Sequence, residues 1–85
     1  MTHPLHDPGH RRIAAILVEL RKQRGLLQQD VADRLERTQG FVSKVESGAR
    51  RLDLIELLDF LRALEADPHT FVDAVLEQPL SALPR

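Results

Sequence analysis

The sequence predicts an all-α fold, a compact domain of five helices, and three observations support this prediction. Apolar residues recur at the three- and four-residue spacing of helices in five separate segments. Residues that commonly start or stop helices flank most of these segments. No segment alternates apolar and polar residues as a half-buried strand does. The length of 85 residues allows one small domain with a single core.

The first two helices are defined by their apolar spacing. We expect the first over residues 11–24, ended by Gly25, because its last turn is basic and glycine commonly follows a helix end. We expect the second over residues 28–36. The inward-facing residues of the first are Ile13, Ile16, Leu17 and Leu20, and those of the second are Val31, Ala32 and Leu35.

The third and fourth helices have clear starting signals. Thr38 is a good N-cap for a helix over residues 39–47, which Gly48 closes. Asp53, followed three residues later by Glu56, forms a capping-box pattern for a helix that runs to Glu65.

The fifth helix begins with Asp67 as N-cap and Pro68 at the first helical position, and it runs to about Glu77. Pro79 then stops it. Residues 1–10 contain two prolines and are expected to form a flexible arm. The domain therefore covers residues 11–78, and residues 79–85 are a tail that retains Leu80 and Leu83.

The fourth helix has more apolar residues than one core contact needs, since its apolar positions cover more than a stripe of ~100°. A domain of this size also has little core of its own, so a second subunit is a natural source of buried area. We therefore expect the last two helices to contribute to a dimer interface. The candidate residues are Phe60, Phe71, Val72, Val75 and Leu76.

Charge is divided between the two halves of the chain, although the net charge is only −1. Residues 11–51 contain ten Lys and Arg and five acidic residues, a net charge of +5. Residues 52–85 contain two basic and seven acidic residues, a net charge of −5, and Asp7 supplies the remaining −1. The basic half indicates a surface for a polyanion, and the acidic half indicates a different role.

The third helix has two chemically different sides. Val42 and Val45 lie on one side and are expected to pack on the core. The other side, at the start of the helix, carries amide, hydroxyl and ammonium groups. Such groups bind base edges and phosphates, so the segment 28–48 is typical of two helices of which the second enters the DNA major groove.

This segment resembles the lambda-repressor/Cro-type helix-turn-helix family, also called the XRE family. The resemblance rests on LxxxRxxRGLxQxDVAxxL over residues 17–35 and on TQGFVSKVESGARRLD over residues 38–53. It covers about residues 13–66 and implies the lambda-repressor-like fold. It also implies that the protein binds duplex DNA.

The resemblance implies a role for individual residues. Gln28 would bind a phosphate at a helix N-terminus, and Gln39 would lie against Gln28 and present its amide to a base. Arg21 and Glu46 occupy the positions of a partly buried ion pair between the first and third helices. The expected DNA-binding residues are Gln28, Thr38, Gln39, Gly40, Phe41, Ser43, Lys44, Arg50 and Arg51. For Phe41, packing on the core is an equal alternative, and for Arg50 and Arg51 a solvated loop is nearly so.

Three residues depart from the family pattern. Glu36 stands where the turn usually has Gly, which would cost about 1 kcal/mol if its φ is positive. Arg37 replaces an apolar turn residue, and would leave the turn more open to solvent or bring its guanidinium near DNA. Leu27 replaces a capping Ser, Thr or Asn, at a cost of roughly 1 kcal/mol.

Other classes of function find little support in the sequence. There is no Cys, no nucleophile–base set and no phosphate-binding glycine loop, so we expect no enzyme and no cofactor. We also expect no metal site: His3, His6 and His10 cluster in the arm but lack a carboxylate cage, and His69 is expected at the surface. No apolar run reaches the ~20 residues that span a bilayer, and we expect a cytoplasmic protein.

The sequence therefore predicts a transcriptional regulator, with repression the commoner outcome, that binds a palindromic operator in double-stranded DNA as a homodimer. One alternative is an antitoxin or a restriction-modification controller that regulates its own operon; an antitoxin would hold a toxin with the acidic half. The other is a protein-interaction module that keeps the helix-turn-helix shape without binding DNA.

Overall fold

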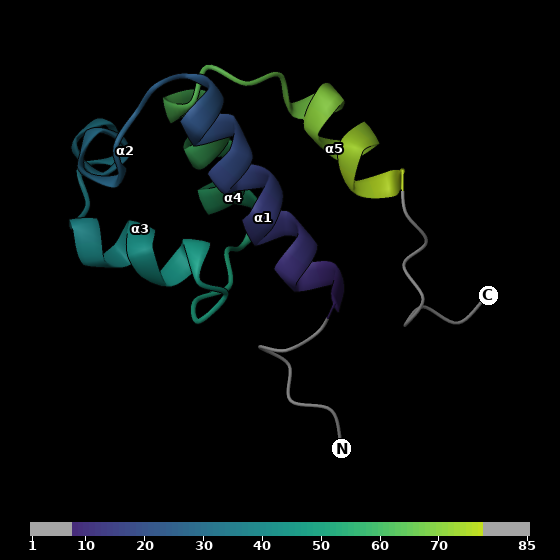
Figure 1. Cartoon of the computed structure of the whole chain (residues 1–85), viewed down its shortest axis with the longest axis horizontal. Helices are drawn as coiled ribbons and strands as arrows, with labels where there is room; N and C mark the ends of the chain where they lie inside the picture. Colours follow the sequence, from purple (N-terminus) through teal and green to yellow (C-terminus); the bar gives the residue numbers. More distant parts are fainter. Residues whose placement is uncertain (1–7, 78–85) are drawn as a thin grey trace.

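The computed structural model describes residues 8–77, which form five helices joined by short connections (Figure 1). The prediction of an all-α, five-helix domain is confirmed. The helices are α1 (Pro8–Gln23), α2 (Gln28–Leu35), α3 (Gln39–Glu46), α4 (Leu54–Ala63) and α5 (Pro68–Leu76).

Helix α1 organises the domain. It packs against both α3 and α5, while α2 packs against α3 and α4. In Figure 1, α1 crosses in front of α4, with α2 and α3 on one side and α5 on the other. Helices α1 and α4 therefore pack against the inward side of the helix pair α2–α3, and the outer side of α3 stays uncovered.

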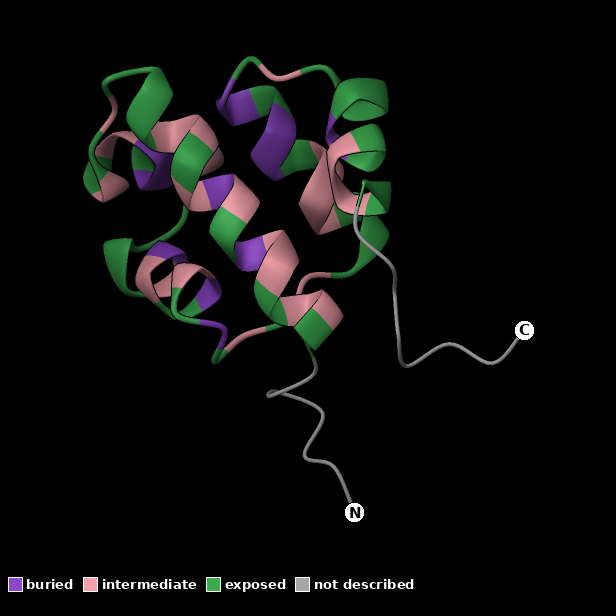
Figure 2. Ribbon diagram, turned by 45° about the vertical axis from the view of Figure 1, so that its right-hand side comes forward, coloured by how far each residue is buried: buried purple, intermediate pink, exposed green. Residues whose placement is uncertain are grey.

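The core consists of side chains that every helix contributes, and the buried positions in Figure 2 lie on the inward faces of the helices. Ala32 of α2 is fully buried in the same core cluster as Val42 and Val45 of α3. Burial of apolar surface is the main source of stability in so small a domain. The largest fully buried side chains are Leu17, Val31, Val42, Phe60, Leu61 and Leu64.

The predicted caps start the helices as expected. The Thr38 Oγ1 accepts a hydrogen bond from the Phe41 N–H at 3.1 Å. Asp53 and Glu56 form the reciprocal capping box, with donor–acceptor distances of 2.7 and 3.0 Å. Asp67 accepts from the backbone N–H of Thr70 at 2.9 Å, which holds the pKa of Asp67 below its usual value.

Two helix boundaries differ from the prediction by more than one residue. α1 begins at Pro8 and not at residue 11, because proline has a backbone angle suited to the first helical position. α4 ends at Ala63 and not at Glu65, whose φ of 55° breaks the helix. The remainder of the expected arm, with His3 and His6, and the tail with Leu80 and Leu83 lie outside the described residues.

The helix-turn-helix turn has the strained backbone that the sequence indicated. Glu36 has φ 56° and ψ 41°, the left-handed conformation that glycine adopts more easily. At the start of α2, Leu27 provides no side-chain cap, but the Asp30 carboxylate accepts from the Leu27 N–H at 2.8 Å. Asp30 thus supplies the half of a capping box that binds the N-cap N–H, while the half that an N-cap side chain would supply is missing.

The expectation that Phe60 and Phe71 contribute to a dimer interface is wrong. Their side chains are buried in the core of a single chain, with exposed fractions of 0% and 4%, and cannot contact a second subunit. Val75 also packs partly against this core. Four other large apolar side chains of the last two helices are exposed by half or more: Leu54, Ile55, Val72 and Leu76.

Candidate nucleic-acid interface

A hydrogen-bonded network of four polar side chains links α1, α2 and both ends of α3. Arg21 donates to the Glu46 carboxylate through Nε at 2.7 Å and through Nη2 at 3.1 Å. Gln28 donates its Nε2 to the same carboxylate at 2.9 Å. Gln39 in turn donates its Nε2 to Gln28 Oε1 at 2.7 Å. The Arg21–Glu46 pair and the Gln28–Gln39 contact both agree with what the family resemblance implied.

The Arg21–Glu46 ion pair of this network is largely removed from water. The side chains of Arg21 and Glu46 retain only 12% and 5% of their exposure. Burying two charges is costly unless hydrogen bonds satisfy them. Here Arg21 also donates to the Leu26 carbonyl at 2.8 Å, and Glu46 accepts three hydrogen bonds. The pair is therefore well satisfied, and it ties the C-terminal end of α3 to α1.

The buried carboxylate fixes the direction of both amides. An ionised carboxylate can only accept hydrogen bonds, so Gln28 must turn its NH₂ group to Glu46. Its Oε1 then faces Gln39, which must donate its own NH₂ group. This leaves the Oε1 and the second N–H of Gln39 available on the exposed side. An amide with one free acceptor and one free donor matches the N6 and N7 atoms of an adenine edge.

The outer side of α3 is exposed around this amide. Gln39, Gly40 and Lys44 are exposed and Ser43 is partly exposed, while Val42 and Val45 on the opposite side are buried. A Cβ atom added at Gly40 would meet only Thr38 Oγ1, at 3.8 Å, which is an ordinary van der Waals distance. Packing within the chain therefore does not require glycine here. Glycine is nevertheless present, although inside a helix it is less stable than alanine by about 0.5–1 kcal/mol.

Phe41 lies beside this surface but is covered by two arginines. It packs partly against the core, and the Arg37 guanidinium lies 3.9 Å from its ring centroid. The Arg50 guanidinium lies 5.1 Å from the same centroid. Of the two interpretations of Phe41, packing describes this structure better than an open contact surface.

Arg50 and Arg51 differ in their surroundings. Arg50 donates to both oxygens of Glu56, at 3.2 and 2.7 Å, whereas Arg51 is exposed. The hydrogen bond from Arg50, followed by that from the Asp53 backbone, holds the pKa of Glu56 below its usual value. The same contact with Glu56 raises the pKa of Arg50. The sequence showed no sign of this pairing, since Glu56 was expected only to cap α4.

Neither a metal cluster nor a membrane-spanning helix is found among the described residues. Within residues 8–77, no three His, Cys, Asp or Glu side chains gather as metal ligands would. His10 lies in α1 and His69 is exposed in the first turn of α5. In the same range, every helix is too short or too polar to cross a membrane.

Comparisons with known proteins agree with the helix-turn-helix fold. A family model described as a helix-turn-helix domain matches residues 12–72. An XRE-family-like protein from Pseudomonas syringae pv. tomato str. DC3000 is similar in structure, with a TM-score of 0.80 and 37% identity over 87% of this chain and 92% of that one. A search of curated proteins found no match.

The fold is also similar to that of the restriction-modification controller protein C.Esp1396I. The wild-type structure aligns with a TM-score of 0.78 and 18% identity, covering 82% of this chain and 92% of that one. The tetramer of that controller in complex with its natural 35 base-pair operator gives a TM-score of 0.77, with the same identity and coverage. At this identity the likeness concerns the fold.

The buried ion pair leads to a stability prediction. Arg21→Ala leaves the Glu46 carboxylate buried without its main partner and should lower the free energy of unfolding by about 3 kcal/mol. Arg62→Ala is the matched control, because Arg62 pairs with Asp59 at 3.5 Å at an exposed position. It should cost less than about 1 kcal/mol. Urea unfolding monitored by circular dichroism measures both, and equal losses would contradict the importance of the buried pair.

Proposed function

Because the chain belongs to the XRE-like helix-turn-helix family of DNA-binding regulators, we propose that it is a sequence-specific transcriptional regulator that binds a palindromic operator as a homodimer. Helix α3 enters the major groove, with the two half-sites about one helical turn, ~34 Å, apart. Occupancy of the operator blocks RNA polymerase, so repression is the proposed outcome. The protein acts in the cytoplasm, without a cofactor and without a catalytic step.

The orientation of Gln39 is the observation that carries this proposal. Its amide stands at the exposed start of α3 and is held through Gln28 by the buried Glu46. A side chain already held in a defined direction loses less conformational entropy when it binds a base. Gly40 beside it allows the DNA to approach the helix backbone, and Lys44 supplies a positive charge for a phosphate.

The exposed apolar side chains support the homodimer. Leu54 and Ile55 lie in the first turn of α4, with exposed fractions of 68% and 67%. Val72 and Leu76 are spaced by one helical turn on α5 and are exposed by 51% and 61%. A small domain gains stability by burying such side chains against a second copy, and a two-fold dimer matches a palindromic site.

Selection of bound fragments from a random duplex DNA pool, at near-physiological salt, tests the proposed function. We expect an enriched palindrome. Gln39→Ala should then lose discrimination at one base pair of each half-site, by ~1–3 kcal/mol, because the base would no longer find its hydrogen-bonding partner. Lys44→Ala is the control, and should weaken binding to all sequences and flatten the dependence on salt.

Two results would count against this proposal. A folded protein that enriches no sequence would favour the antitoxin or the interaction module, and a protein partner would be sought. If Gln39→Ala weakens specific and random DNA equally, Gln39 does not read a base.

The homodimer makes a separate prediction. Leu76→Glu places a charge in the proposed interface and should convert the dimer into a folded monomer, which sedimentation velocity detects. His69→Glu is the control, since His69 is exposed in the first turn of the same helix. An unchanged sedimentation coefficient for Leu76→Glu would place the interface elsewhere. Val75 is unsuitable for this test because it packs partly on the core.

A further inference from the structure

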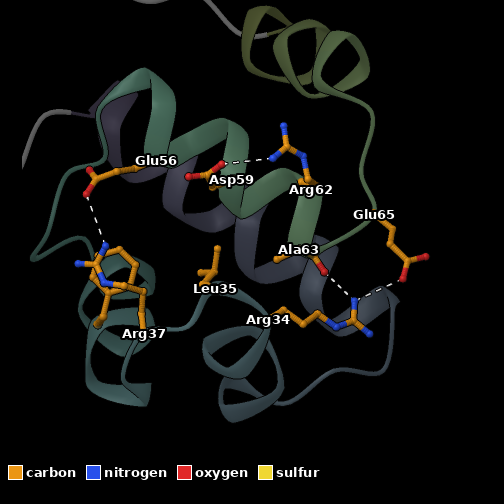
Figure 3. Close-up of a pocket in the computed structure, with 9 residues that line it drawn as sticks. Arg34, Leu35, Arg37, Glu56, Asp59, Arg62, Ala63 and Glu65 are labelled. Atoms are coloured by element: carbon orange, nitrogen blue, oxygen red, sulfur yellow. Dashed lines mark hydrogen bonds and ion pairs between the residues drawn. The ribbon is translucent and has the colours of Figure 1, made fainter.

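Two arginines and one glutamate form a cluster at the edge of the proposed DNA-binding surface. Arg37 lies in the turn before α3, and Arg50 lies in the segment after it. Glu56, in the first turn of α4, contacts both: its Oε2 lies 2.7 Å from Arg50 Nη2 and 3.9 Å from Arg37 Nη1. Figure 3 shows Arg37 and Glu56 directed toward one another across the groove between α4 and the helix-turn-helix.

The Phe41 ring holds the two guanidiniums in place independently of Glu56. Their centres lie 3.9 and 5.1 Å from the ring centroid, within the range of a cation–π contact. Both arginines therefore keep a platform if the carboxylate loses its charge. The cluster is open to solvent, with exposed side-chain fractions of 45% for Arg37, 38% for Arg50 and 23% for Glu56.

In the free protein, Glu56 occupies the position that a bound anion would take. Its two oxygens accept from the two terminal nitrogens of Arg50, at 3.2 and 2.7 Å. Arginine binds phosphate oxygens with the same paired geometry. A phosphate that bound the same two terminal nitrogens of Arg50 would have to replace the carboxylate, and the two anions would repel one another.

We propose, on the basis of the proposed DNA-binding function, that Arg37 and Arg50 form a phosphate site for the DNA backbone and that Glu56 is an internal competitor for it. Glu56 closes the site in the free protein. Each duplex must displace the carboxylate from the arginines, so Glu56 lowers the affinity for every sequence. It does not touch the bases and does not set which sequence is preferred.

The variant Glu56→Gln tests this proposal, because glutamine keeps the capping role at the start of α4 but removes the charge. Asp59→Asn is the matched control: it removes one negative charge from the same helix, at an exposed residue that pairs with Arg62 at 3.5 Å. Binding is measured by fluorescence anisotropy with the selected operator duplex and a scrambled duplex of equal length, over a series of salt concentrations. Circular dichroism establishes that each variant is folded.

Glu56→Gln should bind both duplexes about threefold to tenfold more tightly than the wild type. The slope of log K against log salt should change by less than the ~0.9 expected for one phosphate contact, because the arginines reach the same DNA phosphate in both proteins once the carboxylate is displaced. Asp59→Asn should change the affinity much less. In an Arg50→Ala background the effect of Glu56→Gln should shrink, since the carboxylate then has one arginine fewer to release.

Three results would overturn the proposal in distinguishable ways. Equally tighter binding by Glu56→Gln and Asp59→Asn would show that only overall charge matters. Unchanged or weaker binding by folded Glu56→Gln, while the wild type binds, would show that Glu56 does not compete with phosphate. If the wild type binds neither duplex, the proposed function fails and the phosphate site fails with it.

Discussion

The Glu46 carboxylate at the end of α3 is the constraint on which the rest of the structure depends. It is almost fully buried and accepts hydrogen bonds from Arg21 and Gln28. Through Arg21 it fixes α3 against α1, and through Gln28 it fixes the start of α2 and the direction of the Gln39 amide. One buried charge thus connects the packing of the helix-turn-helix with the chemistry on its outer side.

The two glutamates that face arginines have different consequences. Glu46 is 5% exposed, so its partners cannot readily exchange it for water or another anion. Glu56 is 23% exposed and lies at the solvent edge of the Phe41 platform, where an incoming phosphate could replace it. Burial therefore separates a structural ion pair from one that competes with a ligand. In the proposed mechanism, the first governs which base is read and the second governs how strongly the backbone is held.

Local signals made much of the fold predictable from the sequence. Thr38, Asp53 and Asp67 cap helices through neighbouring backbone groups, so the residue type and position were sufficient. The Arg21–Glu46 pair and the Gln28–Gln39 contact came from the family resemblance, because spacing alone does not show which helices meet. The structure has both contacts; the predicted DNA contacts remain predictions.

Features that depend on tertiary packing could not be predicted. The sequence showed an excess of apolar residues on the fourth helix and indicated an interface on the last two helices. It did not show that Phe60 and Phe71 face the core while Leu54 and Ile55 stay exposed. It likewise held no sign that Arg37, Arg50 and Glu56 meet around Phe41, since these residues come from three segments.

The most direct test of the central claim uses Glu46→Gln, which fills the same space but can turn either a donor or an acceptor toward Gln28. If Glu46 fixes the direction of Gln39, the folded variant should lose discrimination by about 1–3 kcal/mol at the base pair that Gln39 reads. This loss is expected although the side chain at position 46 does not contact DNA. The measurement compares its affinity for the selected operator with that for single-base variants; full discrimination at every position would contradict the claim.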